Sequence, residues 1–209
     1  AEERDTLEPG QATTAVFYSI SNCQKGLRRV SFGNLLIKQV VEELRAEFPK
    51  LTTFVTLSPV PGFAAWMARE GLEHEAELRL PATAGGAEPG EAEQKKAATA
   101  RADRLSALCA HYLTEAKRPD GGPQNAVARF HLGNGARLER VNAEADLSPR
   151  GQAESHGVMV NYLYDLRDIE RNHEAFAGRG EIAHSSPVRR IARTGAALMA
   201  AASYEQKTT

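Results

Sequence analysis

The sequence predicts an α/β fold in which helices flank a sheet, and three neighbouring segments support this prediction. Residues 15–21 alternate in polarity and are rich in aromatic and β-branched side chains, as β-strands are. After a loop with two glycines, apolar residues from 34 to 48 recur at the spacing of an amphipathic helix, which Pro49 ends. Residues 51–57 form a second strand-like run. A strand, a glycine loop, a helix and a second strand in this order are typical of α/β proteins.

Two later segments affect where functional residues are expected to lie. Residues 80–100 hold few large apolar side chains and many Ala, Gly, Pro and charged residues, so we expect a mobile surface insertion there. Gly133-Asn134-Gly135 lies between two apolar runs and indicates a hairpin turn, which would place His131 on a strand. The other expected elements are helices over 63–69, 102–116, a short piece capped by Ser148 and Pro149, 168–176 and the Ala-rich tail, and a strand over 158–166.

Composition and charge exclude several classes of protein. The 209 residues are 42% hydrophobic and 25% charged, which is the composition of one globular domain. Lys and Arg total 26 against 27 Asp and Glu, so no global field attracts nucleic acid or anionic lipid. We find neither an apolar run long enough to span a membrane nor a signal peptide, and therefore expect a cytoplasmic protein. Cys23 and Cys109 lie far apart, the histidines have no metal-ligand spacing, and we assign neither a disulfide nor a metal.

The loop between the first predicted strand and helix is a candidate anion site. Free backbone N–H groups and the helix dipole favour an anion at such a place, and Lys25, Arg28 and Arg29 add three cations. A pyrophosphate with an additional phosphate nearby fits this pattern, and coenzyme A carries these groups. An ordinary turn with solvated basic residues explains the same sequence and is the more common case for such a loop.

Ser58 and His131 are candidate chemical groups, each with a structural alternative. Ser58 stands at the end of a predicted strand beside prolines, where a hydroxyl can be presented at fixed geometry, although such a serine is commonly a turn or cap residue. His131, between Phe130 and Leu132, can be an acid or base or a half-buried structural histidine.

Several longer segments together resemble one known family. FYSISNCQKGL, FGNLLIKQVVEEL, FVTLSPVPGF, VARFHLGNGARLERVN and GVMVNYLYDL are similar to the catalytic domain of the malonyl-CoA decarboxylases, in order over residues 15–177. The resemblance implies a mixed sheet of the acetyltransferase (GNAT) type flanked by helices. The family's N-terminal helical domain and early strands would precede residue 15, so we expect the fold to be incomplete at its N-terminus. We accordingly expect a leader or truncated edge over 1–14, the catalytic domain over 15–177 and a partly helical tail over 178–209.

The resemblance also implies roles for individual residues. The family's catalytic serine, histidine and active-site tyrosine match Ser58, His131 and Tyr164. The positions that match the family's malonyl-CoA contacts are Gln24, Gly26, Arg28, Arg29, Val30, Ser31, Phe32, Gly33, Asn34, Ser58 and His131. The sequence departs from the family pattern at Ser31, where an acidic residue is common, and at Ala143, where Trp is typical.

The implied activity is decarboxylation of malonyl-CoA to acetyl-CoA and CO2 in fatty-acid metabolism, by a homo-oligomer. No separate cofactor is expected, since the substrate itself carries coenzyme A. An imidazole with the ordinary pKa of about 6.5 suits proton delivery, so we assign His131 as proton donor and Ser58 as the group that orients the substrate or exchanges a proton. The alternatives are a coenzyme A-dependent acyltransferase of the same fold and a non-catalytic coenzyme A-binding fragment.

Overall fold

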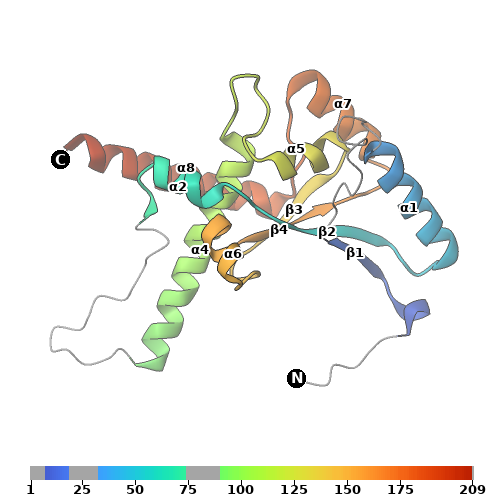
Figure 1. Ribbon diagram of the computed structural model, residues 1–209, viewed down its shortest axis with the longest axis horizontal. Helices are drawn as coiled ribbons and strands as arrows, with labels where there is room; N and C mark the ends of the chain where they lie inside the picture. Colours follow the sequence, from blue (N-terminus) through green and yellow to red (C-terminus); the bar gives the residue numbers. More distant parts are fainter. Residues whose placement is uncertain (1–7, 19–32, 74–89, 209) are drawn as a thin grey trace. The chain divides into compact units, whose positions relative to one another are not determined.

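The computed structural model describes residues 8–18, 33–73 and 90–208 (Figure 1). The chain divides into two compact units. The first comprises residues 1–58, 130–138 and 161–183, and the second comprises residues 59–129, 139–160 and 184–209. Each unit therefore combines segments that are distant in the sequence.

Four strands form one mixed sheet in the order β1-β2-β4-β3. Their bounds are Thr14–Tyr18 for β1, Thr53–Pro59 for β2, Arg137–Asn142 for β3 and Met159–Leu163 for β4. β1 and β2 run parallel. Phe54 contacts Tyr164, whereas Thr56, further along β2, contacts Tyr162, so β2 and β4 run in opposite directions. The α/β class with helices flanking a sheet is confirmed.

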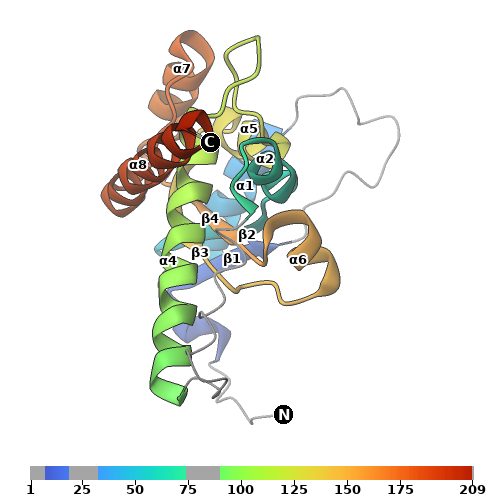
Figure 2. The ribbon, with the colours of Figure 1, turned by 90° about the vertical axis from the view of Figure 1, so that its left-hand side faces the viewer.

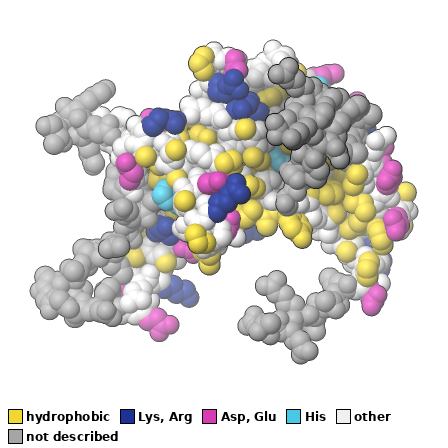
Figure 3. Space-filling model, in the orientation of Figure 1, with side chains coloured by type: hydrophobic (Ala, Val, Ile, Leu, Met, Phe, Trp, Pro, Cys, Tyr) yellow, Lys and Arg dark blue, Asp and Glu magenta, His cyan; other side chains and the backbone are white. Residues whose placement is uncertain are grey.

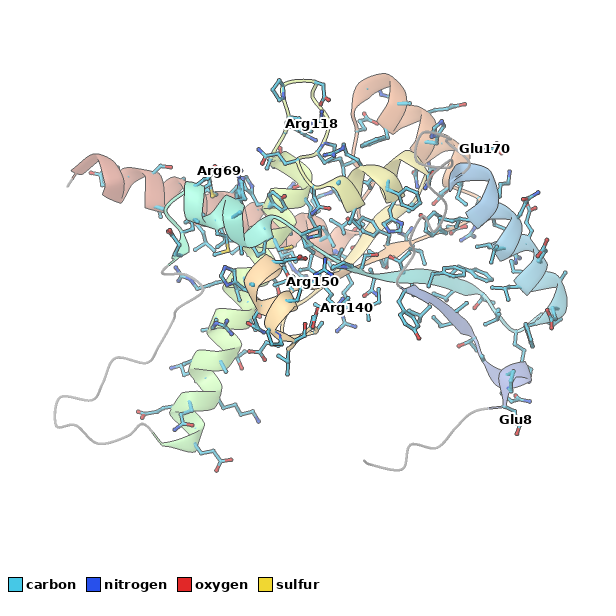
Figure 4. The ribbon with its side chains drawn as sticks, viewed as in Figure 1. Glu8, Arg69, Arg118, Arg140, Arg150 and Glu170 are labelled. Carbon is cyan, nitrogen blue, oxygen red and sulfur yellow. The ribbon has the colours of Figure 1, made fainter. Side chains whose placement is uncertain are left out.

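The first unit holds the predicted strand, helix and strand. Helix α1, Gly33–Glu47, connects β1 to β2, and a parallel pair needs a crossover of this kind (Figure 1). Val41 of α1 is fully buried, as its apolar spacing predicts. Helix α7, Ile169–Arg179, belongs to the same unit, and Glu170 near its start pairs with Lys38 of α1 at 3.0 Å (Figure 4). Both side chains are accessible to water, so this pair adds little to stability.

The second unit is mainly helical. It contains α2 at Phe63–Arg69, α4 at Glu91–Glu115, α6 at Pro149–Ser155 and α8 at Ser186–Thr208. Helices α4 and α8 pack against each other (Figure 2). Gly195 permits this approach, because a Cβ there would lie 2.2 Å from the Ala107 carbonyl oxygen. Stacked and tilted rings of Phe63, Trp66 and Tyr112 form an aromatic cluster in the core.

Two local predictions are wrong, and both concern helices. Residues 91–100 belong to α4 rather than to an irregular insertion, while 80–89 lie outside the described residues. Residues 126–133 form helix α5 (Ala126–Gly133) instead of the first strand of a hairpin, so His131 lies on a helix. Asn125 begins this helix, because its Oδ1 accepts a hydrogen bond from the Ala128 N–H at 2.8 Å. Ala128, His131 and Leu132 are buried at helical spacing.

Charges of both signs are scattered over the described part of the face in Figure 3, where groups of Lys and Arg lie beside Asp and Glu. This distribution agrees with the near-zero net charge. Among the helices that the structure describes, none is both long and apolar enough to cross a membrane.

Candidate active site

One face of the sheet gathers hydroxyl and aromatic side chains within the first unit. Side chains alternate along β2, so Thr56 and Ser58 are buried on the same face. The same alternation in and just after β4 buries Tyr162 and Tyr164. Because β2 and β4 are neighbours in the sheet, these four side chains lie close to one another.

The end of helix α5 places His131 at this face. The helix stops where Gly135 adopts a left-handed backbone with φ of 77°, and the His131 carbonyl accepts the Ala136 N–H at 3.1 Å. Any Cβ at Gly135 would lie 2.2 Å from the Ile169 carbonyl oxygen, so only glycine lets the turn approach the start of α7 so closely. Asn172 of α7 also donates its Nδ2–H to the Gly135 carbonyl at 3.2 Å. The position of His131 is therefore fixed by the backbone that follows it.

A chain of hydrogen bonds joins the three residues to which the family resemblance assigns catalysis. The His131 Nε2 lies 3.2 Å from the Ser58 Oγ, and its Nδ1 lies 2.8 Å from the Tyr164 hydroxyl. The Ser58 hydroxyl donates to the Thr56 Oγ1 at 2.9 Å, and that oxygen also accepts the Tyr162 backbone N–H at 3.2 Å. The structure thus brings Ser58, His131 and Tyr164 together, although they are 73 and 33 positions apart in the sequence.

The buried surroundings of these hydrogen bonds favour uncharged side chains. The His131 ring stacks on Tyr162, with centroids 4.6 Å apart and planes 22° from parallel. Burial lowers the pKa of His131 to about 4, well below the ordinary value that we expected from the sequence. Burial also raises the pKa of Tyr164, against a smaller lowering by Asn134. At pH 7 both side chains are therefore neutral in the free chain.

The malonyl-CoA contacts implied by the resemblance fall largely outside the described residues. Gln24, Gly26 and residues 28–32 are not described, and Gly33 and Asn34 form the first turn of α1 without described side chains. Across 8–18, 33–73 and 90–208, no group of three or more His, Cys, Asp or Glu side chains is arranged to hold a metal ion.

Sequence reasoning missed three residues that contact the hydrogen-bonded group of Ser58, His131 and Tyr164. Thr56 and Tyr162 stand two positions before Ser58 and Tyr164, so strand alternation alone could have placed them on the same face. Asn134 is buried beside Tyr164, and its position three residues after His131 becomes informative only once that segment is known to end a helix.

The lowered pKa of His131 makes stability depend on pH. The unfolded chain, with the ordinary imidazole pKa of 6.5, binds this proton more readily than the folded chain does. The free energy of unfolding contributed by this ring is therefore fully present above pH 6.5 and is lost as the pH falls toward 4. We expect the stability advantage of the natural chain over His131→Asn to shrink by roughly 3 kcal/mol between pH 7 and 4.

Urea unfolding of both proteins at several pH values between 4 and 7 measures this difference. Ser58→Ala is the matched control, because it keeps the imidazole and should retain the pH dependence of the natural chain. Unfolding free energies of the natural chain and His131→Asn that run parallel with pH would contradict the prediction.

Comparison with known proteins places this chain in a family. The family described as "Malonyl-CoA decarboxylase C-terminal domain" matches residues 1–204. The mitochondrial malonyl-CoA decarboxylase of the goose Anser anser anser is 39% identical over 90% of this chain and 41% of its own length. The rat enzyme of the same name is 38% identical over 88% of this chain and 42% of its own length.

A solved structure of a malonyl-CoA decarboxylase is also similar to this chain. The crystal structure of malonyl-CoA decarboxylase from Agrobacterium vitis superposes with a TM-score of 0.76 at 50% identity, covering 91% of this chain and 48% of that one. The chain thus spans somewhat less than half the length of these relatives. Because the family match covers nearly the whole sequence and the fold agrees with it, the chain belongs to the malonyl-CoA decarboxylase family, as its C-terminal domain.

Proposed function

We propose that this chain carries the catalytic groups for decarboxylation of malonyl-CoA to acetyl-CoA and CO2, as a carboxy-lyase. The observation that supports this most directly is the buried hydrogen-bond chain from Ser58 through His131 to Tyr164. The family resemblance assigns catalysis to these three residues, and sequence order alone would not bring them into contact.

The reaction breaks the bond between the methylene carbon of the malonyl group and its carboxylate carbon. The electron pair of that bond enters the thioester, which becomes an enolate as CO2 leaves. A proton is then added to the methylene carbon, so each turnover consumes one proton. Because the thioester accepts the electrons, no separate cofactor is proposed, and coenzyme A enters as part of the substrate.

His131 is the proposed proton donor. Its ring is neutral at pH 7 in the free chain, because burial lowers its pKa to about 4. A malonyl carboxylate bound beside the ring would raise that pKa, since a nearby anion stabilises the imidazolium. The ring would then take up the proton that the reaction consumes and deliver it to carbon once CO2 has left.

Ser58 and Tyr164 support this step. The Ser58 hydroxyl, next to the Nε2 of His131, is placed to hydrogen-bond the malonyl carboxylate or the thioester oxygen, or to exchange a proton with the ring. Tyr164 holds the opposite ring nitrogen and so orients the imidazole. The proposed coenzyme A contacts are those of the basic loop, Gln24, Gly26 and Arg28 to Asn34, which are assigned from the resemblance.

Incubation with malonyl-CoA alone tests this function against its alternatives. Acetyl-CoA and CO2 formed without any acceptor support the decarboxylase. Acyl transfer that requires an added amine would support an acyltransferase instead, and intact malonyl-CoA with measurable binding would support a non-catalytic coenzyme A-binding fragment. A role in fatty-acid metabolism, a homo-oligomeric state and a cytoplasmic location remain predictions; the avian and rat relatives are named mitochondrial.

Replacing both Arg28 and Arg29 by Ala is expected to raise KM for malonyl-CoA more than it lowers kcat. Contacts to the coenzyme A phosphates are remote from the reacting carbon and are equally present in the ground and transition states. The effect should decrease as salt is added, because salt screens exposed charges. Steady-state kinetics at low and high ionic strength measure both expectations, and an unchanged KM at low ionic strength would contradict them.

A further inference from the structure

Asn134 carries a buried amide group that the proposed mechanism does not use. Its backbone N–H bonds the carbonyls of Phe130 and His131, each at 3.1 Å, which fixes it in the turn that ends α5. Only 5% of the residue is exposed, and its Nδ2 makes no hydrogen bond of good geometry with any described residue. The side chain nevertheless lies close enough to the Tyr164 hydroxyl to lower its pKa. A buried amide donor without a partner is costly and therefore calls for an explanation.

In the protein without substrate, the hydrogen-bond partners of Tyr164, His131 and Ser58 determine which atom carries each proton. The buried Tyr164 hydroxyl needs an acceptor for its proton, and the His131 Nδ1, 2.8 Å away, can supply it. The ring proton of the neutral imidazole is then on Nε2, which faces the Ser58 Oγ. Ser58 in turn donates to the Thr56 Oγ1. An Asn134 Nδ2 facing Tyr164 fits this arrangement, because a donor cannot take the phenol proton.

When His131 is protonated, the Tyr164 oxygen must accept a hydrogen bond from the ring and can no longer donate one to it. An imidazolium donates from both ring nitrogens, so its Nδ1–H points at the Tyr164 oxygen. The Tyr164 proton then needs another acceptor. A half-turn of the Asn134 amide replaces its Nδ2 by its Oδ1 and supplies that acceptor, because the two ends of an amide are a donor and an acceptor of nearly equal shape.

We propose that Asn134 is a positioning residue whose amide, by turning Nδ2 or Oδ1 toward Tyr164, sets whether the Nδ1 of His131 carries a proton. Its effect on the ring proton concerns the free chain and does not depend on any reaction. Its effect on turnover rests on the proposed decarboxylation, in which the ring must gain and lose a proton once in each cycle.

Nitrogen NMR of the histidine ring, in the chain without substrate at pH 8, tests the proposal. We expect the natural chain to carry its ring proton on Nε2. Asn134→Asp places a permanent acceptor beside Tyr164 and should move a proton onto Nδ1, whereas the apolar, similarly sized Asn134→Leu should leave Nδ1 unprotonated. Adding Tyr164→Phe to Asn134→Asp should abolish the change, because the hydroxyl that links the two side chains is gone.

Three outcomes would overturn the proposal: a proton on Nδ1 in the natural chain, no change in Asn134→Asp, or a change that persists in the double variant. The last would show a direct effect of charge on the ring. The first is read without any variant, so the test does not depend on Asn134→Asp folding. A merely structural asparagine would lower the thermal midpoint in both single variants and leave the ring proton on Nε2.

Turnover adds a second measurement. With malonyl-CoA, Asn134→Leu should lower kcat about tenfold at unchanged KM, as expected for the loss of one hydrogen bond needed only when the ring is protonated. An unchanged kcat would overturn the catalytic part of the proposal. If the natural chain does not decarboxylate malonyl-CoA at all, the proposed function fails, while the NMR result decides the role of Asn134 independently.

Discussion

His131→Asn is expected to lower kcat for malonyl-CoA decarboxylation by about 10²- to 10⁴-fold, the usual range for loss of a general acid. Asn keeps an amide near the position of Nδ1 but has no ring nitrogen that could take up a proton and release it to carbon. KM for malonyl-CoA should change less than kcat, because most of the proposed substrate contacts lie in the basic loop and His131 faces only the malonyl group. Steady-state kinetics, with the concentration of folded protein measured for each sample, give both constants.

His173→Asn is the matched control for this variant. His173 lies in the same unit, and its Nδ1 bonds the Gly133 carbonyl at 2.6 Å, so it stabilises the end of α5 without touching the Ser58 hydroxyl. Because Asn places an amide near that Nδ1, His173→Asn can keep the bond to the Gly133 carbonyl and should preserve kcat per folded molecule. If His131→Asn behaved in the same way, with near-normal kcat, the proposed mechanism would be wrong even though the family assignment would stand.

Ser58→Ala is expected to lower kcat by about 10²-fold, the loss associated with one oriented hydrogen-bond donor. The variant removes the hydroxyl that lies 3.2 Å from the His131 Nε2 and leaves the imidazole in place. Single-turnover measurements with malonyl-CoA should show the loss in the chemical step rather than in substrate binding. The loss should be smaller than that of His131→Asn, because the proton donor remains.

Ser155→Ala is a suitable comparison, since Ser155 is also buried and its hydroxyl bonds the Gly151 and Val158 carbonyls. We expect that variant to lose stability and to keep its turnover per folded molecule. Equal and small effects of the two serine substitutions on kcat would indicate that Ser58 is structural.

Elements whose patterns are purely local could be predicted from the sequence. The apolar spacing that ends at Pro49 predicted α1, and the short helix over 63–69 has the observed bounds. The cap formed by Ser148 was also predicted, and its side chain accepts the Gly151 N–H at 3.0 Å. In each case, residues within one or two turns decide the structure, so no information about tertiary contacts was needed.

The segment around His131 was mispredicted because two turn types share one sequence signal. Asn134-Gly135 suits a tight hairpin turn, but it equally suits the left-handed residue that ends a helix. The helical alternative had visible support in Asn125, a good helix-starting residue, and in the spacing of Ala128, His131 and Leu132. The hairpin is predicted because two short apolar runs flank Gly133-Asn134-Gly135, and a short apolar run can also be one buried helix.

The start of α4 was missed for a different reason. Residues 91–100 hold almost no large apolar side chains, and this composition argues against regular structure. They are nevertheless rich in Ala, Glu, Lys and Gln, which have high helix propensity, and they continue into the buried part of the helix that begins at Leu105. Low hydrophobicity therefore predicted exposure correctly but not the loss of a helix.

The close approach of Gly135 to α7 affects how variants of this chain should be classified. A methyl group at position 135 would meet the Ile169 carbonyl oxygen, so accommodating it must shift either α7 or the helix end that carries His131. Gly135→Ala should therefore reduce turnover although glycine offers no chemical group. In a substitution survey scored by activity alone, such a variant would be grouped with His131 and Ser58. In the Gly135→Ala variant the imidazole is misplaced, whereas in His131→Asn it is missing. A ligand that stabilises the native turn could therefore restore function to Gly135→Ala but not to His131→Asn.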